Sequence, residues 1–359
     1  MLHVLDPQSP ISETSLTRSG GFAWWYVDAV DEHGNGFVCI WSWGLPFLPG
    51  YAGSVRRGND VPAASRPSFN LAIYEQGRPA LYLLQEHAPD AARRDQTEWC
   101  FGDTRITRAG NALHLAISAP IPGSPDRLVG TIRVSGAEWT RRVGGPAPQE
   151  RSHGWCPQLG PCNASVDLVH GADRFSYNGP AYADRNEGDQ PLHALGIDRW
   201  VWGRATWPDE TRIAYVLWPE GGGAPTPYAI RILSNGDAIV SEATVETGRN
   251  AFSPWGEATP SSLTLTVDGE HFLTLATQHP VDNSPFYARS LGRGTCALGE
   301  RPAMIESCTP RRIDPGWFRP LLSMATHRVG GRNSMWLPLF VGPQRTRWPR
   351  LFASWRGIA

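Results

Sequence analysis

Two short segments of the chain combine an acid, a histidine and aromatic rings at a spacing that could serve chemistry. The segment SHGWCP places His153 and Trp155 two residues apart, and AYADRN places Tyr182 and Asp184 at the same spacing. Residues two apart in an extended chain point to the same face. If both segments line one cavity wall, the four side chains meet at one point. The alternative is a loop in which these polar groups only satisfy their surroundings.

The aromatic content suggests what an acid could do at such a point. The chain has sixteen tryptophans, and a surplus of indoles serves core bulk, stacking on sugars, or stabilisation of a cation by the ring quadrupole. Sugar stacking beside paired carboxylates would fit glycoside hydrolysis. Carbocation chemistry would explain why acids and indoles occur together, because an acid protonates an alkene and aromatic faces then stabilise the cation. Asn186 and Asp189, which follow Asp184, are interpreted as structural support for the loop.

A metal centre is the other chemistry that this region could hold. His153, Cys156, Cys162 and His170 follow one another closely. Zinc sites use a ligand pair repeated at fixed spacing, and these spacings do not repeat. The sequence therefore disfavours a metal site.

Composition excludes several classes of protein. The chain has 359 residues, of which 41% are hydrophobic and 19% charged, so a large core is expected. The net charge of −1 argues against a nucleic-acid partner, because phosphate binding needs an excess of basic residues. Six scattered cysteines form no CxxC pair and are expected to be free and buried. With no signal peptide or long apolar run recognised, we expect a cytoplasmic protein.

Short segments with strand-like composition run along the whole chain. Turn signals such as DEHGNG and LSNGDA separate them, and long segments with helical periodicity are absent. The pattern predicts an all-β protein built as a sandwich or barrel. A loop-like stretch at 143–154 predicts two packed β-domains, 1–148 and 149–359, with the active site near their interface. The strand-like segments are 24–30, 36–43, 69–75, 80–86, 112–118, 128–134, 164–169, 200–207, 212–219, 228–234, 237–246, 262–268 and 271–277.

These motifs together resemble those of the carotenoid 1,2-hydratases, also called hydroxyneurosporene synthases. The resemblance runs nearly end to end, from GGFAWWYVDAVDEHGNGFVCIWSWG at 20–44, through FNLAIYE and the His-x-Trp segment, to DNSPFYARS at 282–290. Its most specific part is Tyr-x-Asp-x-Asn-x-Gly-Asp-x-Pro at 182–191. The segment GWCPQLGPC and the long C-terminal part depart from the expected pattern.

The resemblance implies a two-part, lipocalin-like β architecture and the cofactor-independent addition of water to a terminal prenyl double bond of an acyclic carotenoid. It also implies that His153, Trp155, Tyr182 and Asp184 are the catalytic residues. Related lipocalin-like proteins include terpenoid cyclases, so the fold alone does not decide the reaction. A cyclase using the same protonation step and a non-catalytic binder of an apolar ligand remain alternatives.

The implied chemistry assigns a role to each residue. Burial would raise the pKa of Asp184 and keep it protonated as the general acid. Trp155 and Tyr182 would offer ring faces to the cation, and His153 would direct a water. Six further residues are expected to bind the substrate. The tryptophans would form the wall of its site, and the aspartates are the second and third candidates for the general acid: Trp24, Trp25, Trp200, Trp202, Asp28 and Asp103.

The C-terminal segment 309–359 is basic and rich in tryptophan. It holds nine arginines against one acid, Asp314. Trp317, Trp336, Trp348 and Trp355 are interleaved with these arginines. One interpretation is a solvated edge whose aromatic rings pack on the β core. The other is a peripheral membrane contact, which would suit an enzyme whose apolar isoprenoid substrate dissolves in a bilayer.

Overall fold

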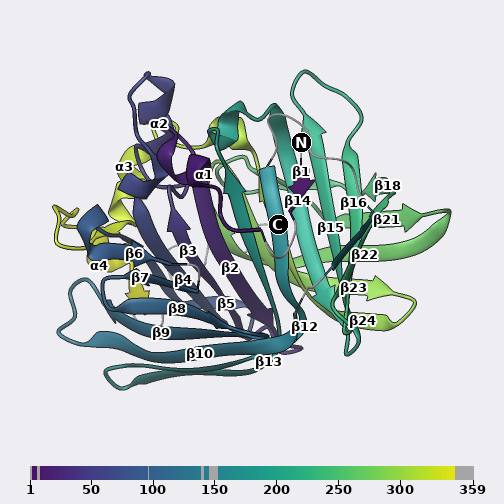
Figure 1. The fold of residues 1–359 in the computed structure, drawn as a ribbon, viewed down its shortest axis with the longest axis horizontal. Coiled ribbons are helices and arrows are strands. Elements are labelled where there is room, and N and C mark those ends of the chain that lie inside the picture. The colour runs from purple at the N-terminus through teal and green to yellow at the C-terminus, as the bar shows by residue number, and fades with distance from the viewer. Residues whose placement is uncertain (1, 6–8, 96, 139–140, 145–152, 344–359) are drawn as a thin grey trace.

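The chain folds into two large curled β-sheets that pack against each other (Figure 1). The computed structural model describes residues 2–5, 9–95, 97–138, 141–144 and 153–343. About 60% of the chain is strand and about 10% helix, which confirms the predicted all-β class with little helix. Within the described residues, no helix is long and apolar enough to cross a bilayer.

Counted over the described residues, the first sheet has fourteen strands, and it contains the motif-bearing segments. Its order is β25-β5-β4-β3-β2-β13-β12-β10-β9-β8-β7-β6, with β1 added to β12 and β26 to β5. The strands are β1 (Leu2–Val4), β2 (Phe22–Val30), β3 (Gly36–Trp43), β4 (Pro67–Glu75), β5 (Arg78–Glu86), β6 (Ala92–Arg94), β7 (Glu98–Phe101), β8 (Thr104–Ala109), β9 (Ala112–Pro120), β10 (Arg127–Glu138), β12 (His153–His170), β13 (Asp173–Gly188), β25 (His327–Arg328) and β26 (Gly342–Pro343).

In the described part of the chain, the second sheet has ten strands in the order β11-β17-β16-β15-β14-β24-β23-β22-β21-β18. These strands are β11 (Arg141–Gly144), β14 (Ile197–Thr206), β15 (Glu210–Pro219), β16 (Thr226–Leu233), β17 (Asp237–Glu242), β18 (Thr244–Thr247), β21 (Ser262–Val267), β22 (Glu270–Asn283), β23 (Tyr287–Cys296) and β24 (Gly299–Cys308). A separate hairpin joins β19 (Asn250–Phe252) to β20 (Ala258–Pro260).

Helices are few and short. The α-helices are α1 (Glu13–Thr17), α2 (Tyr51–Arg56), α3 (Arg319–Met324) and α4 (Leu337–Phe340). Single 3-10 turns are η1 (Ala63–Ser65), η2 (Pro89–Ala91), η3 (Leu192–Ala194) and η4 (Pro310–Arg312).

The two sheets exchange strands along the chain. β11 precedes residue 148 but pairs with β17 of the second sheet, whereas β12 and β13 follow that residue and pair with β10 and β2 of the first. The main changeover between the sheets therefore lies between β13 and β14. The predicted domain boundary at 148 lies outside the described residues and stays a prediction.

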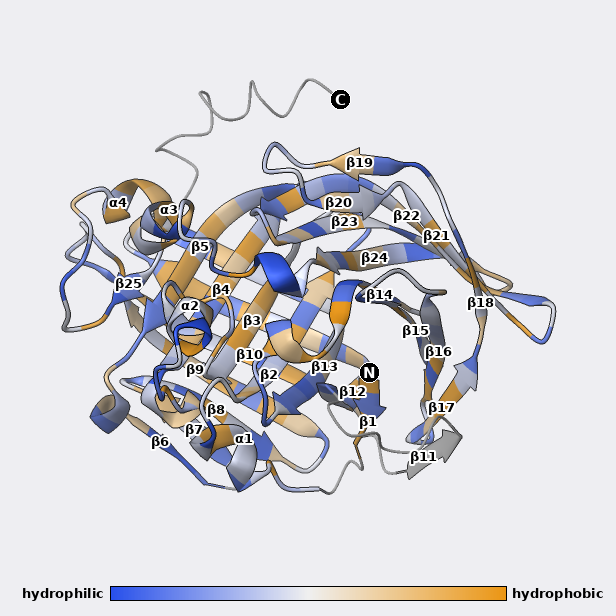
Figure 2. Ribbon diagram, turned by 90° about the horizontal axis from the view of Figure 1, so that it is seen from above, coloured by the Kyte–Doolittle hydropathy of each residue, from blue (hydrophilic) through white to orange (hydrophobic). Residues whose placement is uncertain are grey.

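Side-chain alternation on the strands divides the apolar interior into three cores. On β2, Trp25 and Val27 point into the curl of the first sheet. Trp24 and Tyr26 point the other way, into a core shared by the two sheets that also holds Trp202. A third core fills the curl of the second sheet. Figure 2 shows both curls from above. All six cysteines are free and buried, as predicted.

A network of buried charges crosses the core between the sheets. Arg204 on β14 forms an ion pair with Asp28 on β2, and both side chains are inaccessible to solvent. The hydroxyl of Tyr26 lies 2.9 Å from Asp28 Oδ2 and 2.8 Å from Oε1 of Glu306 on β24. Arg289 on β23 donates to Glu306 at 2.9 Å. The carboxylate of Asp28 is engaged in this link between the sheets, and its role as a substrate-binding residue or second candidate acid stays a prediction.

Candidate active site

The registry of three neighbouring strands brings the two motifs together. β12 and β13 pair antiparallel with Trp155 opposite Asn186, and β13 pairs with β2 with Asn186 opposite Trp24. His153, Trp155, Tyr182, Asp184 and Asn186 all lie buried on the side of the first sheet that faces the second. The strand pairing thus brings the four catalytic candidates together, as the two-residue spacings predicted.

Three hydrogen-bond donors hold the carboxyl group of Asp184. Trp155 Nε1–H donates to Oδ2 at 2.8 Å, and the hydroxyl of Tyr182 donates to the same oxygen at 3.0 Å. Asn186 Nδ2 donates to Oδ1 at 2.7 Å. Because the residue is only 3% exposed, water contributes little to this environment.

Burial gives Asp184 the protonation state that an acid catalyst needs. Removal from solvent raises the pKa of Asp184 to about 8, although the hydrogen bonds from Trp155 and Tyr182 oppose the rise. At neutral pH most of the carboxyl is therefore protonated. The surrounding donors are already aimed at the anion that would form when the proton leaves.

His153 is connected to Asp184 through Asn186. Its Nε2 lies 2.8 Å from Asn186 Oδ1, and its Nδ1 lies 3.2 Å from the hydroxyl of Tyr215. Since the amide nitrogen of Asn186 donates to Asp184, the amide oxygen must accept from Nε2–H of His153. Nδ1 is then the acceptor for Tyr215. Burial lowers the pKa of His153 to about 4, so the ring is neutral near pH 7.

Aromatic rings enclose these polar groups. The centroids of Trp24 and Trp200 lie 5.6 and 6.0 Å from that of His153. Trp202 lies 5.7 Å from Tyr182, and Phe22 meets His153 edge-on at 5.5 Å. The prediction of an aromatic wall is therefore consistent with the positions of Trp24, Trp200 and Trp202.

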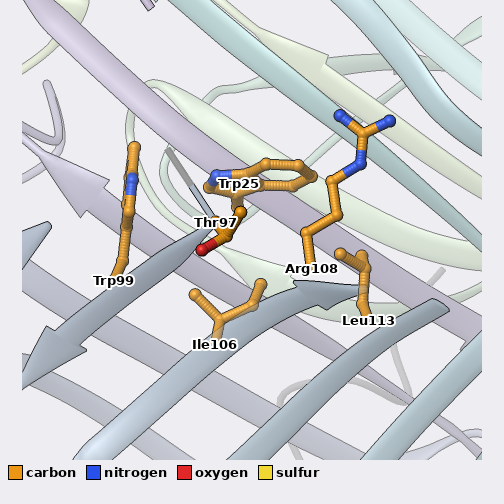
Figure 3. Close-up of a pocket in the computed structure, with 6 residues that line it drawn as sticks. All are labelled: Trp25, Thr97, Trp99, Ile106, Arg108 and Leu113. Atoms are coloured by element: carbon orange, nitrogen blue, oxygen red, sulfur yellow. The ribbon is translucent and has the colours of Figure 1, made fainter. Parts of the chain in front are cut away.

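The structure does not bring Trp25, another predicted member of the wall, to the Asp184 site. It follows Trp24 on β2 and so faces the opposite side of the sheet, inside the curl. There it lines a small hollow of about 10 Å³. Figure 3 shows the ring of Trp25 above Ile106, with Arg108 and Leu113 beside it.

Asp103 and Asp189 also lie away from the site. Asp103 is in an exposed turn and pairs with Arg127 at 2.9 Å, so the structure does not bring this predicted substrate-binding residue or third candidate acid to Asp184. Asp189 pairs with Arg18 at 3.1 Å, which fits the structural role expected of it. Asn186 does more than support a loop, because it lies in β13 and bridges His153 to Asp184.

Sequence reasoning missed Tyr215. It lies on β15 in the second sheet, and its hydroxyl reaches His153 across the core between the sheets. Alternation in the segment 212–219 places Tyr215 on the same face as Ile213 and Leu217. That pattern could have identified an inward tyrosine but not its partner. Among the described residues, no group of three or more potential ligands is arranged to hold a metal.

Comparison with known proteins identifies the family. The model of the family described as carotenoid hydratase CrtC matches residues 40–335, a range that contains Asp184, its three hydrogen-bond donors and His153. The chain belongs to the carotenoid hydratase CrtC family. The resemblance in the motifs is thereby confirmed.

Several relatives of this family member have curated names. It is 29% identical over 324 residues to an acyclic carotenoid 1,2-hydratase of Thiocapsa roseopersicina, covering 87% of this chain and 74% of the relative. It is 27% identical over 288 residues to an acyclic carotenoid 1,2-hydratase of Rubrivivax gelatinosus, and the match covers 78% of this chain and 66% of the relative. It is 25% identical over 363 residues to a hydroxyneurosporene dehydrogenase of Chlorobaculum tepidum, and the match covers 90% of this chain and 91% of the relative.

Solved structures share the fold of this carotenoid hydratase family member. A putative AttH from Nitrosomonas europaea superimposes with a TM-score of 0.60 at 14% identity, covering 86% of this chain and 99% of that one. CghA in a structure with Sch210972 gives a TM-score of 0.53 at 13% identity, covering 85% and 95%. At these identities the likeness concerns the fold alone.

Proposed function

We propose that this chain adds water to the terminal prenyl double bond of an acyclic carotenoid or a similar isoprenoid, without a cofactor. Family membership and the names of two relatives support hydration of such a substrate. The observation that carries the chemistry is the buried carboxyl of Asp184, held by three donors inside an aromatic enclosure, where burial raises its pKa to about 8.

Asp184 begins the reaction as the general acid. Its O–H bond breaks as the alkene π pair forms a C–H bond at the CH carbon of the terminal double bond, which leaves a carboxylate and a tertiary cation at the carbon that bears two methyl groups. Trp155, Tyr182 and Asn186 already donate to both carboxylate oxygens. The anion is therefore stabilised without reorganisation, which is how preorganised donors lower a barrier.

Aromatic faces stabilise the cation before water reaches it. Each ring that faces a cation contributes about 0.5 to 2 kcal/mol. In addition to Trp155 and Tyr182, the rings of Trp24, Trp200 and Trp202 surround the acid and His153. The same apolar wall keeps bulk water away, so that capture depends on a positioned water molecule.

His153 accepts the proton that the adding water releases. Because Nδ1 already accepts the hydroxyl hydrogen of Tyr215, the water passes its proton to that hydroxyl while the hydroxyl hydrogen moves to Nδ1. The low pKa of His153 does not prevent this step, because the oxygen that has just bonded to a carbocation is a far stronger acid than imidazolium. Before the next turnover His153 releases its proton and the carboxylate of Asp184 regains one, so no net proton is consumed, while Asn186 keeps the two side chains aligned.

Pigment analysis tests the proposal. Expression in a host that accumulates lycopene should give a product heavier by one water, and the Asp184→Asn variant should not. A product of unchanged mass but altered chromatography would instead show a cyclase. Unchanged lycopene that copurifies with the protein would show a binder, and either result would contradict hydration.

A further inference from the structure

Exposed apolar side chains gather at one end of the molecule. Seven large hydrophobic residues are exposed among the described residues, and four of them lie between 317 and 336. These four form what we call the docking surface: Trp317 (65% exposed), Leu321 (37%), Met335 (84%) and Trp336 (51%). Figures 1 and 2 both place the neighbouring helices α3 and α4 at the same end of the molecule. A cluster of this kind marks an interaction site.

The surroundings of the docking surface are positively charged. The segment 309–343 has five arginines and a single acid, Asp314. The side chain of Asp314 is fully buried and paired with Arg319, so it adds no negative charge to the surface. Arg311, Arg328 and Arg332 are exposed on this segment, although Arg311 and Arg328 also pair with acids of the β core.

We propose that the docking surface binds an anionic lipid bilayer. Tryptophan favours the headgroup boundary, and arginines are attracted to an anionic leaflet. The choice of a bilayer rests on the proposed function, because a carotenoid-like substrate is dissolved in membrane and its concentration in water is negligible. The further part of the predicted tail, including Trp348 and Trp355, lies outside the described residues.

Contacts connect the docking surface, through α2, to a residue that packs against His153. Asp314 accepts hydrogen bonds from Arg319 and from the backbone amides of Gly50 and Gly53 at the start of α2. On α2, the hydroxyl of Tyr51 donates to the carbonyl of Gly21 at 2.5 Å.

The next residue, Phe22, lies against His153. The docking surface is therefore connected to the active site through Asp314, α2 and Phe22. A bilayer bound at the docking surface would bring its apolar substrate to a part of the molecule that is in contact with the site.

Sedimentation with vesicles tests the proposal. The full chain should sediment with vesicles of phosphatidylglycerol and phosphatidylcholine at low salt, less at high salt, and weakly with phosphatidylcholine alone. The Trp317→Ser/Trp336→Ser variant should partition at least about tenfold less. Replacing Arg332 by Gln should weaken partitioning by roughly fivefold, as expected for one arginine near an anionic surface.

Matched variants separate the docking surface from general stickiness. Phe252→Ser/Leu298→Ser removes two exposed apolar side chains elsewhere, and Arg174→Gln removes an exposed arginine on β13. Both should sediment like the wild type. Activity of the double tryptophan variant on detergent-solubilised substrate should be unchanged.

Three results would overturn the proposal. The first is a wild-type protein that stays in the supernatant with anionic vesicles. The second is a double tryptophan variant that binds vesicles as well as the wild type does. The third is self-association through the docking surface, detected by analytical ultracentrifugation. Because binding is measured without turnover, an inactive chain that still sediments would contradict only the hydratase proposal.

Discussion

The indole Nε1–H of Trp155 donates to Oδ2 of Asp184 at 2.8 Å, across two antiparallel neighbours, β12 and β13. The hydroxyl of Tyr182 donates to the same oxygen from two residues earlier on β13. Burial favours the neutral acid, whereas these donors favour its anion. The balance between the two effects places the pKa of Asp184 near the pH at which an acid catalyst must release and regain its proton.

Replacing Asp184 by Asn should abolish turnover while preserving the fold. Asn keeps the shape of the side chain but cannot protonate an alkene, so the rate should fall by roughly 10²- to 10⁴-fold. Product formation is measured by chromatography of extracted pigment, with circular dichroism as the check on folding. Asp189→Asn, which alters an exposed ion pair outside the site, is the matched control. Turnover within about threefold of wild type in Asp184→Asn would refute the assignment.

The pH dependence of kcat/KM should be bell-shaped. The rate should fall above about pH 8 as Asp184 loses its proton, and below about pH 4 as His153 gains one. Between these values the protonated acid and the neutral imidazole coexist. Initial rates measured on detergent-solubilised substrate over this range test the expectation. A rate that is still level at pH 9.5 would mean that another group supplies the proton.

Asp184 should also make stability depend on pH. Its folded-state pKa is about 8 and its ordinary value 3.8, so between these values the folded protein binds one more proton than the unfolded chain. The contribution of Asp184 to the free energy of unfolding therefore falls as pH rises through this window, by up to about 1.4 kcal/mol per pH unit. Urea denaturation at pH 5 and pH 8 should show Asp184→Asn gaining stability relative to wild type at the higher pH. A difference that is independent of pH would contradict a buried, protonated Asp184.

His153→Phe should change the products more than the rate of cation formation. Without the basic nitrogen, the cation loses a proton or cyclises instead of capturing water. Tyr215→Phe should have the same effect in weaker form, because it removes the hydrogen bond that orients Nδ1 of His153. Product ratios by chromatography, together with kcat and KM measured separately, distinguish this from loss of folding. An unchanged product mixture in His153→Phe would rule out its role in directing water.

Replacing Arg204 by Met should destabilise the protein strongly. The change leaves the Asp28 carboxylate buried between the sheets without its cation, which typically costs about 3 to 5 kcal/mol. Denaturant unfolding measures the loss, and a second change, Asp28→Asn, should restore part of it. Arg174→Gln breaks an exposed pair with Asp167 and should have little effect. Equal stability of Arg204→Met and wild type would show that the pair does not hold the sheets together.

Local pattern in the sequence was sufficient to predict the all-β class and the central part of the site. The two-residue spacings of His153 with Trp155 and of Tyr182 with Asp184 require a shared face once each segment is extended, whatever the rest of the chain does. The same rule separates Trp24 from Trp25, since adjacent residues on a strand face opposite sides, so grouping both in one wall ignored information that the sequence contained.

Only the tertiary structure decided which groups meet across the core between the sheets. Asp28 finds Arg204 and His153 finds Tyr215 because β2 and β12 of one sheet pack against β14 and β15 of the other. No periodicity relates residues so distant in the chain, and Asp103 looked equivalent to Asp28 until the fold placed it in an exposed turn. The pKa of Asp184 depends on the same packing, because its rise comes from burial by residues of both sheets.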